Sequence, residues 1–536
     1  DTYNTAVGSS AGQEVTTGTQ NTLIGGTTGD ALTTGSGNTA LGISALTRDT
    51  VGSKAVAIGG TALAYQNFTT ATDSYNTAVG YGAGLSVTTG IQNVLIGGLA
   101  GDAITDADFN TAVGHGSLSQ NVLGSKNTAL GTFSLLNVNP ATAADTLNVG
   151  VGYGAGQNVT TAVFNTLVGG LAGDALTTGQ ENAAFGYLAL SGDTLGSHSV
   201  AVGSYALQAQ NFTTATDSFN TAVGYAAGTA VTTGLNNTLI GGQAGDAITA
   251  ANDNVALGVG SLTTNTLSSE NVAIGRSALQ ELNHTTATDG FNVAVGSDAG
   301  KLVTTGIRNT LIGGNSGDSI TDADNNTAVG FNTLISNVLG SKSIAIGSFA
   351  LESQNPATAA DTHNVAVGVS AGGAVTTGLN NTLIGSLSGD ALTSGNSNVA
   401  VGKDALGGDT TGSGSVAVGK DSLKVQNNTT STTMYNVAVG LEAGAAVTTG
   451  VENTFLGGLA GDAITTSEGN VAIGYQALTT EDTTGKATAV GWKALAQQNA
   501  GANSYNVAVG NNAGFSVSTG TANTFVGGLA GDGTDD

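Results

Sequence analysis

The sequence predicts an all-β protein, a parallel β-solenoid (β-roll) built from about 30 stacked coils. Three observations predict this fold. A five-residue unit, Asn-Thr-Ala-Val-Gly in residues 4–8, recurs with small changes along the whole chain. Successive units start 17, 17, 17 and then 21 residues apart, so that the pattern repeats every 72 residues. The fifth residue of the unit is always glycine, and the segments between units lack the periodicity of a helix.

The 72-residue super-repeat contains four coils, and neither a linker nor a change of composition interrupts it. We therefore expect a single continuous domain spanning residues 1–536. At about 4.8 Å per coil, such a stack would form a rod roughly 140 Å long. The super-repeats start at Asn4, Asn76, Asn148, Asn220, Asn292, Asn364, Asn436 and Asn506.

The second, third and fourth positions of each unit predict a short strand. The second is mostly Thr or Val, the third Ala or a larger apolar residue, and the fourth Val, Ile, Leu or Phe. Because neighbouring side chains of a strand point to opposite faces, both faces are apolar. We expect one face to line the interior and the other to meet another chain, with the small alanines of the third position permitting close approach. The alternative is a flattened coil with exposed alanines. A second strand is expected after the glycine, as in residues 114–118.

The fifth and first positions predict the corners of the coil. Glycine bends a strand or takes a positive φ at little steric cost, which suits a corner. The corner glycines of the first coils are Gly8, Gly25, Gly42, Gly59, Gly80 and Gly97. Asparagine dominates the first position, and stacked asparagines would form a hydrogen-bonded amide ladder, the alternative being a turn cap. The first ladder residues are Asn4, Asn21, Asn38, Asn76 and Asn93.

Composition excludes several classes of protein. The net charge of −25, from 12 basic and 37 acidic residues, argues against a nucleic-acid partner, which needs a basic footprint. The absence of cysteine excludes a disulfide scaffold, and no apolar run is long enough for direct membrane insertion. Catalytic motifs are missing too, since there is no zinc-ligand spacing and the four histidines occupy unrelated positions. We expect no enzyme and no required cofactor.

An acidic stripe is the best candidate for a metal site. Gly-Asp recurs in the second coil of each super-repeat, and two copies carry further carboxylates close by. Calcium prefers such oxygen ligands, so Ca²⁺ would suit these positions, while capping of turns by aspartate is the alternative. The candidate ligands are Asp102, Asp106, Asp108, Asp318, Asp322 and Asp324.

The four additional residues of each 21-residue coil predict a loop that bulges from the solenoid. These loops vary most between copies, and both prolines of the chain lie in them. We expect them to contact a receptor, a glycan or a neighbouring fibre, although a plain surface bulge would give the same pattern. The candidate contact residues are Asn67, Phe68, Asn139, Pro140, Asn211, Phe212, Asn283 and His284.

Several units carry a family resemblance. Residues 199–203 read Ser-Val-Ala-Val-Gly, and residues 271–275 read Asn-Val-Ala-Ile-Gly, followed by Ser-Ala-Leu. This pattern resembles the head repeats of trimeric autotransporter adhesins and is similar to repeats of bacteriophage tail fibres. The resemblance implies a left-handed, homotrimeric β-roll in an adhesive fibre outside the cell, on a cell surface or a virion. The coils here are longer than the usual coils of that family.

Together these features predict a non-enzymatic extracellular fibre protein, a rigid rod that displays repeated loops for surface attachment or filament assembly. Its expected partners are copies of itself, including end-to-end contacts, and a host receptor or glycan. One alternative is a bacteriophage tail-fibre shaft used in host recognition. Another is a monomeric solenoid that binds calcium or, through threonine arrays such as those at the Thr-Thr-Gly turns, ice.

Overall fold

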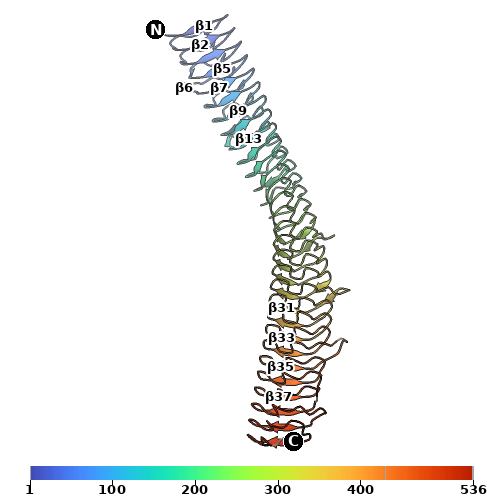
Figure 1. The fold of residues 1–536 in the computed structure, drawn as a ribbon. Helices are drawn as coiled ribbons and strands as arrows, with labels where there is room; N and C mark the ends of the chain where they lie inside the picture. The colour runs from blue at the N-terminus through green and yellow to red at the C-terminus, as the bar shows by residue number, and fades with distance from the viewer. Residues whose placement is uncertain (1, 429, 484, 534–536) are drawn as a thin grey trace. The chain divides into compact units, whose positions relative to one another are not determined.

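The computed structural model describes residues 2–428, 430–483 and 485–533, and these form strands and turns without a helix. The chain divides into two compact units, Asp1–Leu267 and Ser268–Asp536, and each is a stack of similar coils (Figure 1). The predicted all-β parallel solenoid is confirmed, as is the 17-residue spacing of its strands. The single continuous domain, the handedness and the trimeric state stay predictions. None of the described residues forms a helix that could cross a membrane.

The described part of the first unit contains one main sheet of 15 three-residue strands, each parallel to the strand of the next coil. Equivalent positions pair directly, as in Thr5↔Thr22 and Ala6↔Leu23. The strands are β1 (Thr5–Val7), β2 (Thr22–Ile24), β3 (Thr39–Leu41), β5 (Val56–Ile58), β7 (Thr77–Val79), β8 (Val94–Ile96), β9 (Thr111–Val113), β11 (Thr128–Leu130), β13 (Val149–Val151), β14 (Thr166–Val168), β15 (Ala183–Phe185), β17 (Val200–Val202), β19 (Thr221–Val223), β20 (Thr238–Ile240) and β21 (Val255–Leu257).

The second unit repeats this arrangement, again with 15 strands in the main sheet of its described part. These are β23 (Val272–Ile274), β25 (Val293–Val295), β26 (Thr310–Ile312), β27 (Thr327–Val329), β29 (Ile344–Ile346), β31 (Val365–Val367), β32 (Thr382–Ile384), β33 (Val399–Val401), β34 (Val416–Val418), β35 (Val437–Val439), β36 (Thr454–Leu456), β37 (Val471–Ile473), β38 (Thr488–Val490), β39 (Val507–Val509) and β40 (Thr524–Val526).

In the described part of the chain, pairs of two-residue strands join five of the long loops to the coil before them. In the first pair Gly52 lies opposite Thr72 and Ser53 opposite Asp73. The pairs of the first unit are β4 (Gly52–Ser53) with β6 (Thr72–Asp73), β10 (Gly124–Ser125) with β12 (Ala144–Asp145), and β16 (Gly196–Ser197) with β18 (Thr216–Asp217). Those of the second unit are β22 (Ser268–Ser269) with β24 (Thr288–Asp289), and β28 (Gly340–Ser341) with β30 (Ala360–Asp361).

The third position of each unit points into the solenoid, so the expectation that its alanines approach another chain is wrong. Ala78, Leu95 and Ala112 have no exposed surface. Residues of the wall opposite the main strand fill the interior. At one position of that wall, the first and second coils of each super-repeat carry glycine and the third and fourth carry leucine. A Cβ added to Gly84 would lie 2.7 Å from Cδ1 of Leu95. A large third-position residue is therefore matched by glycine across the coil, which leaves no room for voids.

The segment after the corner glycine is a chain of turns, not the predicted second strand. Backbone φ is positive at alternate residues, with values of 136° at Gly114, 63° at Gly116 and 50° at Leu118. The amide nitrogens alternate in direction as well: that of Gly116 donates to Gly98 O at 3.0 Å and that of Leu118 to Ser134 O at 3.1 Å. Since a strand requires negative φ throughout, this alternation excludes one while still bonding each coil to both neighbours.

The corner glycines lie where coils approach each other most closely. Gly241 has a φ of 137°, and a Cβ there would lie 2.5 Å from the carbonyl oxygen of Gly258 in the next coil. No side chain fits at that separation, and the conformation itself disfavours any other residue. Its neighbour Gly242 has no atom within 4 Å of the corresponding Cβ position.

This pair of glycines provides a matched test. Gly241→Ala should destabilise its coils by about 1–3 kcal/mol because it adds backbone strain and a contact with the Gly258 carbonyl. Gly242→Ala should change stability by less than about 0.5 kcal/mol. Hydrogen-exchange protection of residues 221–257, measured together with urea unfolding, checks both. Equal effects of the two substitutions would contradict the role assigned to the corner.

Candidate functional surface

The asparagines of the first position form a buried ladder that links coil to coil. The amide nitrogen of Asn38 donates to Oδ1 of Asn21 at 3.0 Å, and Nδ2 of Asn21 donates to Gly35 O at 2.9 Å, at the end of its own coil. In some coils the amides also bond directly, as from Asn93 Nδ2 to Asn76 Oδ1 at 3.4 Å. Of the predicted ladder residues, Asn21, Asn38, Asn76 and Asn93 are buried and Asn4 is exposed. A buried, fully engaged amide row holds the coils together and offers nothing to a ligand.

The ladder changes its chemistry at the long coils. In the first long coil Ala55 occupies the first position. A glutamine from the same coil replaces the missing side-chain amide, since Asn76 Nδ2 donates to Gln66 Oε1 at 2.9 Å. Gln66 Nε2 in turn donates to Oδ2 of Asp49 at 2.6 Å, and Gly52 N donates to Oδ1 at 2.9 Å. The same contacts recur from Gln210 to Asp193 and from Gln426 to Asp409.

Two long coils show that glutamine and asparagine substitute for one another. Asn127 and Asn271 retain the asparagine of the first position, and in those coils Val138 and Leu282 stand where the others have glutamine. Asn127 Oδ1 then accepts the amide of Asn148 at 3.1 Å. Each long coil therefore supplies one amide acceptor to the next coil, either from its first position or from its glutamine.

Burial raises the pKa of the three aspartates that contact these glutamines. Asp49, Asp193 and Asp409 have no exposed surface. Loss of hydration raises the pKa of each carboxyl above its ordinary value, and the hydrogen bonds from glutamine and from the backbone offset only part of this rise. These acids favour the folded state most when they are protonated.

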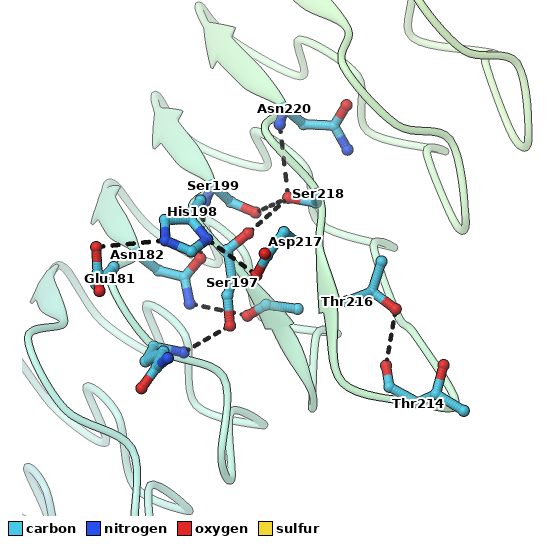
Figure 2. A network of polar contacts seen from close by, with 12 residues as sticks. Glu181, Asn182, Ser197, His198, Ser199, Thr214, Thr216, Asp217, Ser218 and Asn220 are labelled. Atoms are coloured by element: carbon cyan, nitrogen blue, oxygen red, sulfur yellow. Dashed lines mark hydrogen bonds and ion pairs between the residues drawn. The ribbon is translucent and has the colours of Figure 1, made fainter.

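Ion pairs fasten the long loops at the solenoid surface. In three super-repeats a lysine meets an aspartate of the following coil, from Lys54 to Asp73 at 2.7 Å, and likewise at Lys126–Asp145 and Lys342–Asp361. Figure 2 shows the variant in which His198 replaces lysine: its ring lies between Glu181, at 3.3 Å from Nε2, and Asp217, at 3.1 Å from Nδ1. Exposed pairs of this kind contribute little stability each, so they position the loop more than they stabilise it.

Five of the six candidate calcium ligands accept hydrogen bonds, either from a neighbouring coil or from the preceding residue. Oδ1 of Asp102 accepts from Ser119 Oγ at 2.6 Å, and Oδ1 of Asp108 accepts from Ile91 N at 2.7 Å. The other predicted ligands behave in two ways. Asp106, Asp322 and Asp324 accept hydrogen bonds from Thr105, Thr321 and the amide of Ile307, whereas Asp318 has one buried oxygen without a partner among the described residues. No group of three or more acidic or histidine side chains that could hold a metal occurs in the described part of the chain, so calcium stays a prediction.

The predicted contact loops expose only one residue of each pair. Asn67, Asn139, Asn211 and Asn283 are exposed. Phe68, Phe212 and His284 are at most 7% exposed, and Pro140 is buried. The prediction that these four contact a partner is wrong, because their side chains are buried in the solenoid: the Pro140 Cδ lies 3.2 Å from the Cβ position of Gly124 in the preceding coil.

An exposed face without charge runs along the outer side of the main sheet. It is formed by the second and fourth positions and is called here the apolar sheet face. No second or fourth position in any coil is charged. Ile96 and Leu130 are 38% and 46% exposed, respectively. Its other fourth-position residues of high exposure are Val7, Leu41, Phe185, Leu257, Ile312, Ile346, Ile384, Leu456, Val509 and Val526.

Exposed aromatic residues border the apolar sheet face, and the sequence prediction missed them. One row directly precedes the first position and includes Tyr75, Phe219 and Tyr435; a second directly follows the corner and includes Tyr81 and Tyr225. Rings of the second row also touch aromatic residues one position further from the corner, as in the edge-to-face pair Tyr187–Tyr205, with centroids 5.7 Å apart. The recurrence of Tyr or Phe before the first asparagine, at 72-residue intervals, is a signal that could have revealed this border.

Comparison with known proteins gives no family for this chain: no protein-family model matches it, and no curated protein matches it.

The buried aspartates predict a pH-dependent stability. Because their pKa is raised in the folded state, the free energy of unfolding that they contribute falls as pH rises from the ordinary aspartate range, about pH 4, through the raised pKa. Asp49→Asn/Asp193→Asn, which copies the asparagine found at Asn337, removes this fall. The variant's gain in melting temperature over the wild type should be largest near neutral pH and shrink toward zero in acid.

Asp106→Asn/Asp322→Asn is the control, since it removes two exposed carboxylates. Melting curves recorded across the pH range compare the three proteins. A gain that is the same for the buried and the exposed pair, or that does not depend on pH, would contradict the role of burial.

Proposed function

We propose that this chain is a non-enzymatic, extracellular structural and adhesive fibre protein whose solenoids associate side by side with other copies. The observation that carries the proposal is the exposed apolar sheet face. Soluble monomers rarely expose a contiguous apolar patch larger than about 300–600 Å². This face is uncharged in every coil, and its fourth position is always Val, Ile, Leu or Phe, so association with another surface would be favourable. A second copy presents a matching surface with the same spacing.

The area of the face is sufficient for a specific interface. In each unit the 15 main strands stack over roughly 70 Å, at about 4.8 Å per coil, and the three-residue strands are about 10 Å wide. Their product is about 700 Å² per unit and chain, so two copies would bury about 1,400 Å², within the range of stable protein–protein interfaces.

The distribution of charge also favours this face over the others. The chain carries a net charge of −25, which would keep copies apart if acidic residues lined the contact. They do not: Asp73 and Asp217 lie in the short loop strands β6 and β18, and Asp106 lies in a bend, all outside the main sheet. Two copies that meet through the apolar sheet face can therefore associate without opposing like charges.

The extracellular and adhesive parts of the proposal rest on the resemblance to adhesin head repeats, which also favours three chains in the assembly. The loop that recurs every 72 residues would present the same exposed asparagine at regular intervals. A bacteriophage tail-fibre shaft would use the same sheet contact, and it differs in what the fibre is attached to.

A second candidate is the binding of ice by a single solenoid. The first threonines of the Thr-Thr-Gly turns do not favour it, because their hydroxyls bond to the next coil, as from Thr88 Oγ1 to Thr105 O at 3.1 Å. The threonines at the second position of the five-residue unit do favour ice binding. Thr5, Thr22 and Thr39 lie in register on the main sheet with aliphatic residues beside them. A flat row of this kind can order water.

Sedimentation velocity tests the proposal with a matched pair of variants. Ile96→Lys/Leu130→Lys places two charges on the apolar sheet face and should convert oligomers into monomers, because a buried unpaired charge is costly. Thr89→Lys/Thr161→Lys adds the same charge to exposed turns and should leave the assembly intact. A wild-type chain that sediments as a monomer at micromolar concentration would overturn the fibre proposal, and shaping of ice crystals by that monomer would support the second candidate.

A further inference from the structure

The long loops contain a recurring acceptor sequence for N-linked glycans, Asn-x-Thr with x other than proline. It reads Asn-Phe-Thr at residues 67–69 and 211–213, and Asn-His-Thr at residues 283–285. The equivalent loops of the second and fifth super-repeats read Asn-Pro-Ala at residues 139–141 and 355–357, which lack both requirements. The equivalent sequence of the sixth super-repeat includes residue 429, which lies outside the described residues.

The fold exposes the asparagine and the threonine of each loop sequence, which glycosylation requires, and buries the residue between them. Asn67 and Thr69 are exposed, while Phe68 between them is buried. Asn211 and Thr213 are exposed about the buried Phe212 in the same way, and so are the outer residues of the third sequence. The buried middle side chain anchors the loop, so the asparagine is held at the surface by the packing of its neighbour.

The asparagine side chains also have a defined orientation. Thr50 Oγ1 of the preceding coil donates to Oδ1 of Asn67 at 3.3 Å, and Thr194 Oγ1 donates to Oδ1 of Asn211 at 2.9 Å. The carbonyl end of each amide is therefore turned toward the solenoid. Among the described residues, Nδ2 of neither Asn67 nor Asn211 donates a hydrogen bond, so the nitrogen that would carry a sugar faces outward.

We propose that Asn67, Asn211 and Asn283 are N-glycosylation sites, which rests on the proposed extracellular function. The co-substrate is a sugar activated by a nucleotide or lipid diphosphate. The amide Nδ2 attacks the anomeric carbon, forming the nitrogen–carbon bond as the carbon–oxygen bond to phosphate breaks. The diphosphate leaves with the bonding electron pair, and one amide proton passes to a base of the transferase. A glycan would then project from the first, third and fourth super-repeats.

Other Asn-x-Thr sequences of the chain serve as controls for accessibility. Those at residues 236–238 and 325–327 place their threonine in β20 and β27, where it pairs with the next strand. Asn236 Nδ2 also donates to Asp253 Oδ1 at 3.0 Å. In the sequence at residues 158–160, Thr160 Oγ1 donates to Thr177 O at 3.0 Å. In these sequences the asparagine is exposed, as it is in the loops, but the threonine is held by the stacked coils.

The test uses the purified, folded chain with nucleotide-activated glucose and a soluble asparagine glycosyltransferase that accepts folded proteins. Peptide mapping by mass spectrometry should find hexose on Asn67, Asn211 and Asn283, and none at the Asn-Pro loops or the strand-held sequences. A heat-unfolded sample should gain hexose at the strand-held sequences as well, which shows that the enzyme reads them. Loop asparagines that stay unmodified, or that react no faster than the strand-held ones, would overturn the proposal.

Substitution of the exposed threonine gives a second measurement. Thr69→Ala should abolish the glycopeptide of Asn67 and leave those of Asn211 and Asn283 as internal references, whereas Thr69→Ser should retain it. Persistence of the Asn67 glycopeptide in Thr69→Ala would contradict the assignment. Sedimentation tests the fibre proposal separately. Glycosylated loops on a chain that sediments as a monomer would support this inference and contradict only the fibre proposal.

Discussion

Direct stacking of equivalent backbone atoms, one coil above the next, is the constraint on which the rest of the structure depends. At the corners it leaves so little room that a Cβ on Gly241 would lie 2.5 Å from the next carbonyl oxygen. The same register brings each first-position asparagine under the amide of its successor, as between Asn21 and Asn38. Once the coils are in register, strand pairs, turns and side-chain ladders follow at every level.

The long coils show how this stacking absorbs an insertion. Four additional residues displace the loop, and the small strand pair β4–β6 returns the chain to the stack. The amide relay continues through Gln66, which brings a buried carboxylate, Asp49, into the interior. The structure thus keeps the hydrogen bonds between coils but buries a carboxyl group. The stability of the solenoid therefore depends on pH at these coils.

The sequence predicted the fold class, the spacing of the strands and the corners, because these follow from one repeated unit. It did not predict which face of the strand is inside. Alternation defines two faces, and the small alanines of the third position suggested that their face meets another chain. The glycines and leucines of the opposite wall show instead that the third position is inside, as Gly84 does for Leu95. The burial of Phe68 and Pro140 was missed for a similar reason, since variation among the loops is typical of a surface, while their pockets are made by other coils.

The complementarity of Leu95 and Gly84 also bears on how such a chain grows. Duplication of the second coil alone would set two large third-position residues, such as Leu95, directly above each other. A duplicated block of four coils meets its own ends without conflict. Vertical packing therefore favours growth of the solenoid by whole blocks of four coils, because such a block repeats contacts that the stack already makes.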